Sequence, residues 1–279
     1  MDALLSLLGS SIETDRARML VLFLLFLPPF FFSYWAVKRG LHVNLRSIAG
    51  YEALKGLLAQ AAEAGQPVHI SLGIAGIGDE HTADTSAGLA VLDYIADRAA
   101  VSASPPLVTL ANPTALPVAQ DILRRAYRRH GYPEEYDPAR ARFIAPPPTL
   151  NTGSPNPAIY AGNQTDAFAY AAGTMHLLNR ERLVANVMVG FFGDEYLLLG
   201  ETGAQRQLNQ IGGTSAPGVL PFFYATVPDT LVGEEIYAGG AYLSNRLSHV
   251  SSLVAQDVMR WMLVGVVIVG IALKSIGWI

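Results

Sequence analysis

The sequence predicts an α/β protein: a Rossmann-like parallel-sheet domain flanked by one transmembrane helix on its N-terminal side and another on its C-terminal side. Apolar segments fill residues 19–37, which carry no charge, and 261–279, where Lys274 is the one charged residue. Charged residues make up 15% of the 279-residue chain, against about 25% in soluble domains. Between the apolar segments, strand-like runs alternate with helix-like stretches, as in parallel β-α units.

Both apolar segments approach the roughly 20 residues that a helix needs to cross a bilayer core. A cleavable signal peptide is the alternative for the first segment, but acidic residues precede it and no small-x-small cleavage site follows. A buried core helix is the alternative for the second. We expect two spans, at 19–39 and 261–279, preceded by an interfacial segment at 1–18. The expected interface anchors are Tyr34, Trp35, Lys38, Arg39, Trp261 and Trp278.

Basic residues beside the two spans predict the orientation of the chain. Lys38, Arg39, Arg46, Lys55, Arg246 and Arg260 lie toward the central region, and Arg16, Arg18 and Lys274 lie outside it. By the positive-inside rule, the central domain is expected in the cytoplasm and both termini outside. The chain has no cysteine, so disulfides and thiol chemistry are excluded, and its net charge of −4 gives no support for nucleic-acid binding.

The first half of the domain is expected at 40–145. Its Leu89, Leu92 and Ile95 recur at helical spacing on one face. Prolines, a glycine and asparagines exclude regular structure from 146–157, which lies in the expected connection to the second half, 146–164. The predicted strands are 67–76, 106–111 and 141–145, and the predicted helices are 85–99 and 116–131.

The second half is expected at 165–258, and its landmarks repeat those of the first. Gly-Asp-Glu follows a strand at 76–80 and again at 190–195, and in both halves a later apolar strand ends at an alanine, Ala111 or Ala225. The matched order favours two duplicated β-α-β-α halves. Strands are predicted near 184–192 and 219–225, and helices near 165–182, 229–243 and 245–258.

The stretch at 70–84 resembles the start of a phosphate-binding loop, since Gly73 and Gly78 have its spacing. Acidic residues stand where such a loop carries Lys-Ser or Lys-Thr, so a phosphate would be repelled. Ligand sites of open α/β sheets lie at the carboxyl ends of strands, where carboxylates suit Mg²⁺ or Ca²⁺. Helix caps and first-turn acids are the alternative. The candidate metal ligands are Asp79, Glu80, Asp194 and Glu195, to which His81 and Asp84 add two more.

The sequence predicts no catalytic residue and no cofactor-binding residue. It contains neither a GxSxG nucleophile elbow nor an HExxH motif, and its six histidines are scattered.

Arginines make the predicted helix at 116–131 strongly basic. At spacings of three and four residues they line one side of the helix. Held against an anionic leaflet, this face would bind lipid headgroups. A solvated face that pairs with the acids at 134–137 is the alternative. The arginines are Arg124, Arg125, Arg128 and Arg129.

The stretch AAGTMHLLNRERLVANVMVGFFGDEYLLLGETGAQ, at 171–205, resembles an uncharacterised family of bacterial membrane proteins, a domain-of-unknown-function group. The similarity continues through EEIYAGGAYLSN at 234–245. This resemblance implies a membrane-attached α/β domain with no assigned activity, so it carries no catalytic residue over to this chain.

Together these patterns predict a membrane-anchored, oligomeric structural or scaffold protein, or an accessory subunit of a larger membrane complex, without catalysis of its own. Its contacts would use the small-residue helix at 167–173, for which core packing is the alternative, and Gly265 and Gly270 of the second span. One alternative is a divalent-metal-dependent enzyme or ligand-binding domain that uses the paired Gly-Asp-Glu loops. A second alternative is a module that binds an anionic lipid surface.

Overall fold

The computed structural model describes residues 14–40, 43, 45–102, 104–144, 164–244 and 246–275. It contains two compact units, of which Arg46–Ser244 is the α/β domain and the other joins Met1–Leu45 with Asn245–Ile279. Residues 1–13 of the expected interfacial segment and almost all of the proline-rich connection lie outside the described residues.

The elements of the α/β domain follow one another as predicted for β-α units. In chain order they are α3 (Ala49–Ala64), β1 (Val68–Gly73), α4 (Thr82–Ser102), β2 (Leu107–Leu110), η1 (Pro113–Ala115), α5 (Leu116–His130), η2 (Pro133–Glu135), η3 (Pro138–Arg140), β3 (Ala141–Phe143), α6 (Gln164–Arg180), β4 (Ala185–Phe191), α7 (Tyr196–Gln205), β5 (Asn209–Thr214), α8 (Leu220–Thr226), β6 (Asp229–Val232), η5 (Gly233–Ala238) and α9 (Gly239–Ser244).

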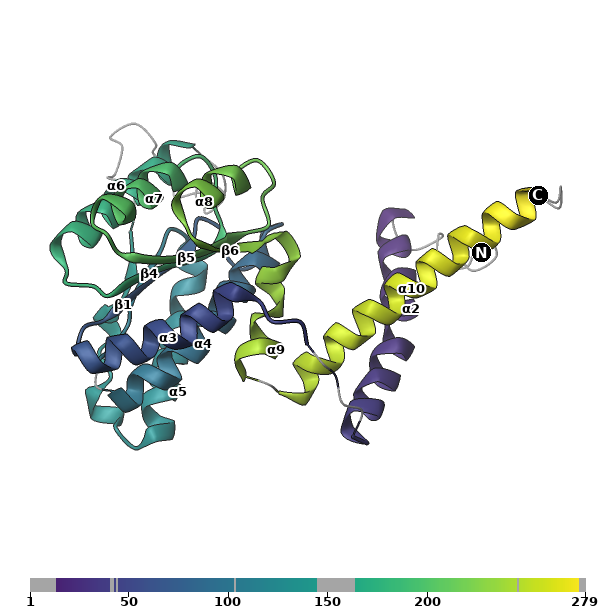
Figure 1. The fold of residues 1–279 in the computed structure, drawn as a ribbon, viewed down its shortest axis with the longest axis horizontal. Helices are drawn as coiled ribbons and strands as arrows, with labels where there is room; N and C mark the ends of the chain where they lie inside the picture. Colours follow the sequence, from purple (N-terminus) through teal and green to yellow (C-terminus); the bar gives the residue numbers. More distant parts are fainter. Residues whose placement is uncertain are drawn as a thin grey trace. The chain divides into compact units, whose positions relative to one another are not determined.

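The six strands form one parallel sheet in the order β3-β2-β1-β4-β5-β6, which confirms the α/β fold. Helices α3, α4 and α5 cover one face, and α6, α7 and α8 cover the other (Figure 1). The chain moves outward from β1 to β3, returns to the centre at β4, and moves outward again to β6. Strands β1 and β4 therefore meet where the winding reverses, at the topological switch point.

The β1–β4 pair approaches unusually closely because a glycine sits on each strand. A Cβ on Gly73 would lie 2.1 Å from the carbonyl oxygen of Phe191, and one on Gly190 would lie 2.2 Å from that of Leu72. The register also shifts between Ser71 and Gly73. Any side chain at either glycine would push the two central strands apart at the end where their loops begin.

The second half differs from the prediction in its outer strands. Residues 219–225, predicted as a strand, lie largely in helix α8, and the strand beside β4 is the unpredicted β5. Ala225 is therefore in a helix and is no structural counterpart of Ala111, so duplication stays a prediction. The helix predicted at 229–243 was also wrong, since this stretch forms β6, η5 and α9. Helices α3 and α7 were not predicted.

The other unit consists of α2 (Thr14–Lys38) and α10 (Leu247–Ser275), which pack against each other. The helix predicted at 245–258 and the span at 261–279 are one continuous helix where they are described. Both helices are long and apolar enough to cross a membrane; 12% of the most apolar stretch of α2 is buried, and none of that of α10. Exposed side chains include Phe23, Leu24, Phe31, Phe32, Leu263, Val267, Ile268 and Ile271.

The expected interface anchors have different positions in this unit. Lys38 ends α2, and the Arg39 guanidinium lies 3.5 Å above the ring of Trp35. Tyr34 is 36% exposed, and Trp261 is exposed within α10 rather than at its start. Trp278 lies outside the described residues.

Polar side chains form a buried chain of hydrogen bonds across the middle of the sheet. His69 Nδ1 lies 2.6 Å from Asn186 Oδ1, and His69 Nε2 lies 2.9 Å from Thr109 Oγ1. Since Asn186 Nδ2 donates to Gln210 Oε1, the Oδ1 atom is the acceptor facing His69, and Nδ1 of the imidazole carries the hydrogen. The remaining ring nitrogen then accepts the Thr109 hydroxyl, so a neutral His69 satisfies both of its partners.

Burial lowers the pKa of His69 from 6.5 to about 4, more than the Asn186 hydrogen bond raises it. Between these pH values, His69 is therefore protonated in the unfolded chain and neutral in the folded chain. Stability from this group is complete above pH 6.5 and falls as the pH drops toward 4.

We predict that acidification over this interval removes about 3 kcal/mol of unfolding free energy through His69, at about 1.4 kcal/mol per pKa unit. His69→Gln should flatten this part of the pH dependence, whatever its effect at neutral pH. The unfolding free energy at each pH is measured by chemical denaturation of the full chain in detergent, followed by near-UV circular dichroism. His176→Gln, on exposed α6 surface, is the control. If the unfolding free energy depends on pH equally in wild type and in His69→Gln over this interval, the prediction is contradicted.

Candidate functional site

The two Gly-Asp-Glu loops lie next to each other, as the predicted site requires. They follow β1 and β4, which pair directly, and the amide of Ile74 donates to the carbonyl oxygen of Phe191 at 3.0 Å. The imidazole of His81, from the first loop, stacks on the ring of Phe191, at the end of β4, with 3.5 Å between centroids. Both loops therefore leave the carboxyl edge of the sheet at the switch point, where α/β proteins bind ligands.

Asp79 organises the backbone of the first loop. Its Oδ2 accepts the Gly76 amide at 2.6 Å, and its Oδ1 accepts the His81 amide at 2.9 Å. Thr82, the first residue of α4, closes the loop by donating to the Asp79 carbonyl oxygen and accepting the Gly78 amide. Both carboxylate oxygens of Asp79 are thus engaged within the loop that precedes α4, and the two amides that they accept lie outside the helix.

A neighbouring loop supports this turn from the side of β2. The Ile77 amide donates to Thr114 Oγ1 at 2.8 Å, and Thr114 Oγ1 donates to Asn112 Oδ1 at 2.8 Å. A Cβ on Gly76 would lie 2.3 Å from the Asn112 side chain. Glycine at this position therefore lets the loops after β1 and β2 interlock.

The second loop contains one buried and one exposed carboxylate. Glu195 is 2% exposed, and its Oε1 accepts the Gly193 amide at 2.8 Å. Burial raises the pKa of the Glu195 carboxyl, and the Gly193 amide opposes part of this effect. Asp194 is exposed, and its carboxylate makes no hydrogen bond or ion pair with another described residue.

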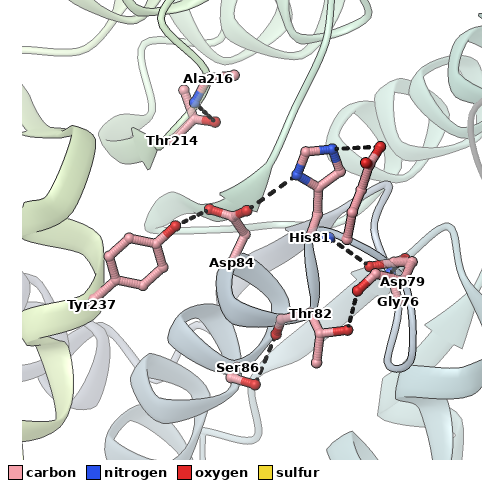
Figure 2. Close-up of polar contacts among 10 residues, drawn as sticks. Gly76, Asp79, His81, Thr82, Asp84, Ser86, Thr214, Ala216 and Tyr237 are labelled. Atoms are coloured by element: carbon pink, nitrogen blue, oxygen red, sulfur yellow. Dashed lines mark hydrogen bonds and ion pairs between the residues drawn. The ribbon is translucent and has the colours of Figure 1, made fainter. Parts of the chain in front are cut away.

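A line of three polar side chains crosses the start of α4 (Figure 2). Tyr237, in η5, donates its hydroxyl to Asp84 Oδ1 at 2.9 Å, and Asp84 Oδ2 lies 3.5 Å from His81 Nδ1. Burial, and after it the neighbouring Asp84 carboxylate, raise the pKa of the Tyr237 phenol above its ordinary value. His81 Nε2, at the other end, lies 3.6 Å from Glu80 Oε1.

The four candidate metal ligands thus lie on two loops that follow paired strands, but they differ in availability. Two are tied to backbone amides, and Glu80 and Asp194 point to solvent with exposed side chains. Among the described residues, no three His, Asp or Glu side chains are placed to hold one metal ion. The Mg²⁺ or Ca²⁺ site stays a prediction from the sequence pattern.

The arginine helix, α5, is largely paired with acids other than those predicted. Its partners come from α5 itself and from α4, instead of 134–137. Arg128 has no ion-pair partner among the described residues, and a lipid-binding face stays a prediction. The pairs are Arg124–Asp121, Arg125–Asp121, Arg129–Asp93 and Arg129–Asp97, at 2.8, 2.9, 3.1 and 3.2 Å.

Sequence reasoning identified His81 and Asp84 and missed the aromatic residues on either side of them. Phe191 reads as the end of an apolar strand, and Tyr237 lies 153 residues beyond Asp84 in a stretch that was predicted helical. Neither residue carries a local signal for this role, because each reaches the site through the packing of strands and helices distant in sequence.

Fold and site together define the class of protein: a Rossmann-type α/β domain with an acidic, histidine-containing switch point, on a chain with two apolar helices. More specifically, the chain belongs to the family described as Domain of unknown function (DUF6754), whose model matches residues 9–148 and 155–279. This confirms the resemblance to an uncharacterised family. No curated protein and no solved structure matches the chain.

We predict that Asp79→Asn destabilises the fold by about 1 kcal/mol, the usual net contribution of one hydrogen bond, since both bonds of Asp79 are part-buried. The asparagine can accept one of the two amides but not both. The measurement is chemical denaturation with a chelator present, so that no divalent cation contributes. Glu80→Gln, whose side chain is 87% exposed, is the matched control and should leave stability unchanged. Equal stability of both variants would argue against a structural role of the Asp79 carboxylate in this loop.

Proposed function

We propose that this protein is a membrane-anchored scaffold or accessory subunit, in which α2 and α10 fix the α/β domain at a bilayer surface. The observation that supports it most is the exposure of the apolar faces of both helices. A soluble protein would bury such faces in its core, whereas lipid solvates them without cost. The basic residues near the inner borders of the spans favour the cytoplasmic side for the domain.

Contacts with other chains are supported by apolar side chains on the α6–α8 face of the domain. Phe168, Leu197, Leu198 and Tyr224 are 43%, 41%, 38% and 62% exposed. Large exposed apolar side chains grouped on one layer are typical of protein interaction surfaces. Within the stretch 167–173, Ala167, Tyr170 and Ala171 are buried, as the core-packing interpretation of the sequence expects, whereas Phe168 is exposed.

The second span retains room for a neighbouring helix. Beyond the helix's own nearby backbone and the two flanking residues, a Cβ placed on Gly265 or on Gly270 would meet no atom of the described residues within 4 Å. These glycines therefore permit close approach by another apolar helix, which is how small residues promote association inside membranes.

We expect the full-length protein to remain with vesicles during an alkaline carbonate wash. Two apolar helices give an attachment that does not depend on the surface charges that such a wash disrupts. Immunoblotting of pellet and supernatant measures it, with residues 46–244 expressed alone as the control that should stay in the supernatant. Release of the full-length chain by carbonate would refute membrane anchoring.

We further expect the chain solubilised in mild detergent to form a particle larger than one 29.9 kDa protomer, alone or with co-purifying chains. Leu197→Gln with Leu198→Gln should reduce its mass, because polar side chains weaken an apolar contact. Light scattering coupled to size-exclusion chromatography gives the protein mass. Val101→Gln, at a 64% exposed position on α4 across the sheet, is the matched control. A bare monomer without partners would contradict the scaffold proposal.

A further inference from the structure

We propose that a hollow at the amino edge of the sheet binds a small phosphate-bearing molecule, through Arg182, Arg206 and the side-chain amides beside them. This edge lies opposite the switch point, so the site is separate from the two Gly-Asp-Glu loops. The proposal goes beyond anchoring and assembly, and neither of those depends on it.

The hollow lies where three neighbouring strands begin. Its lining comes from the residues just before β1 and β4, from the start of β5 and from the end of α3. Its volume of about 400 Å³ is enough for a small ligand. Among the described residues that line it, none is acidic and six are polar: Gln60, Gln66, Arg182, Arg206, Gln207 and Asn209.

Arg182 is the lining cation that the fold itself does not use. It is exposed, and its guanidinium makes no hydrogen bond or ion pair with another described residue. A lone exposed arginine is an ordinary solvated residue, but here a second guanidinium lines the same hollow. Paired guanidiniums are the usual protein partners of an oxyanion, because each offers parallel N–H donors.

Arg206 supplies the second guanidinium, which is already held in place. Its Nη1 donates to the carbonyl oxygen of Leu178 at 2.8 Å and also to that of Asn179. These contacts fix the side chain at the end of α6, while Nη2 and Nε make no hydrogen bond with another described residue. A ligand that engages Arg206 therefore immobilises little that was free before.

Gln207 has a strained backbone at a position where glycine is usual. Its φ of 54° is left-handed, and it is the one non-glycine residue with positive φ in the described part of the chain. The amides of Gln207 and Leu208 close α7 in an ending whose left-handed position commonly holds glycine, as Gly65 and Gly131 do after α3 and α5. Of these three left-handed residues, only Gln207 lines the hollow. Strain kept at this point indicates a use for the glutamine side chain.

Helix ends at this edge oppose an anion, but more weakly than the arginines attract it. Helices α3, α6 and α7 end here, and each C-terminus carries about half a negative charge. Even unscreened, three such ends amount to about 1.5 charges against the two full charges of the guanidiniums. Their last carbonyl groups are also engaged, by chain amides at α3 and α7 and by Arg206 at α6. The hollow therefore attracts anions.

Charge and hydrogen-bonding groups define the class of ligand. Two guanidiniums match a phosphate monoester, with its charge of about −1.5 to −2 near neutral pH, better than a singly charged carboxylate. Amides both donate and accept, as the hydroxyl groups of a small polyol require. Asn209 Nδ2 donates to Gln60 Oε1 at 3.2 Å, so these two amides orient each other. The phosphate group belongs either to a free phosphorylated polyol or to a lipid headgroup.

We expect sn-glycerol 3-phosphate to bind the full chain in detergent, with Kd measured by isothermal titration calorimetry. Arg182→Gln should raise Kd by about tenfold, the loss of one charge-assisted hydrogen bond. The midpoint of chemical unfolding should not change, since Arg182 has no partner in the fold. Arg98→Gln, at an exposed position on α4 outside the hollow, is the matched control and should bind as wild type. Gln207→Gly should raise Kd and also raise the unfolding midpoint, because glycine relieves the left-handed strain.

A lipid source is tested in detergent micelles that contain phosphatidic acid, with phosphatidylcholine, which has no net charge, as the control lipid. Phosphatidic acid should raise the unfolding midpoint of wild type and not of Arg182→Gln, because a ligand of the folded state stabilises it. A response to glycerol phosphate alone indicates a free ligand, and a response to phosphatidic acid alone indicates a headgroup. Either response supports the site.

Four outcomes count against the proposal. It is overturned if neither probe acts on wild type, or if Arg182→Gln responds as wild type does. Equal weakening in Arg98→Gln would show unspecific attraction by charge and reject a site in the hollow. Equal Kd values for glycerol phosphate and glycerate, its carboxylate counterpart, reject the phosphate class. An unchanged Kd in Gln207→Gly overturns the role given to that side chain.

Discussion

The close parallel pairing of β1 with β4 is the constraint on which the rest of the α/β domain depends. Gly73 and Gly190 bring the two backbones closer than any side chain would allow. The two loops then leave the sheet at one point, and the His81 ring can lie on Phe191. Because these strands come from different halves of the chain, this single contact joins the two halves of the sheet and brings the two loops of the candidate site together.

The same pairing explains which strands could be predicted. Strands β1 and β4 are covered by helices on both faces, so nearly all of their residues are buried, and large apolar side chains recur along both strands. Strand β5 is also buried but contains Gln210, Gly212 and Gly213. Its glycines are required by neighbours far along the chain, since Phe223 occupies the space beside Gly212 and Leu231 that beside Gly213. Such requirements leave no periodic pattern, so the apolar residues of α8 were mistaken for the missing strand.

The location of the candidate site could also be predicted from the sequence, but the role of each carboxylate could not. Strand ends with acidic residues identified the two loops that meet, because parallel strands place their carboxyl ends at one edge. What each carboxylate does depends on loop conformation, which residue type alone does not determine. Asp79 accepts two amides of its own turn and Glu195 one, whereas Asp84 depends on a tyrosine from η5. The sequence thus indicated the place, and the hydrogen bonds distinguish structural acids from those available for chemistry.

The position of Asp84 also explains why this strand order, which dinucleotide-binding domains share, does not indicate nucleotide binding in this chain. In dinucleotide-binding domains of the same order, the N-terminus of the helix after the first strand attracts a phosphate through its free amides and dipole. Here that helix is α4, and its first turn carries a buried carboxylate. The field that would draw in a phosphate instead stabilises Asp84, while Asp79 and Thr82 occupy amides of the preceding loop.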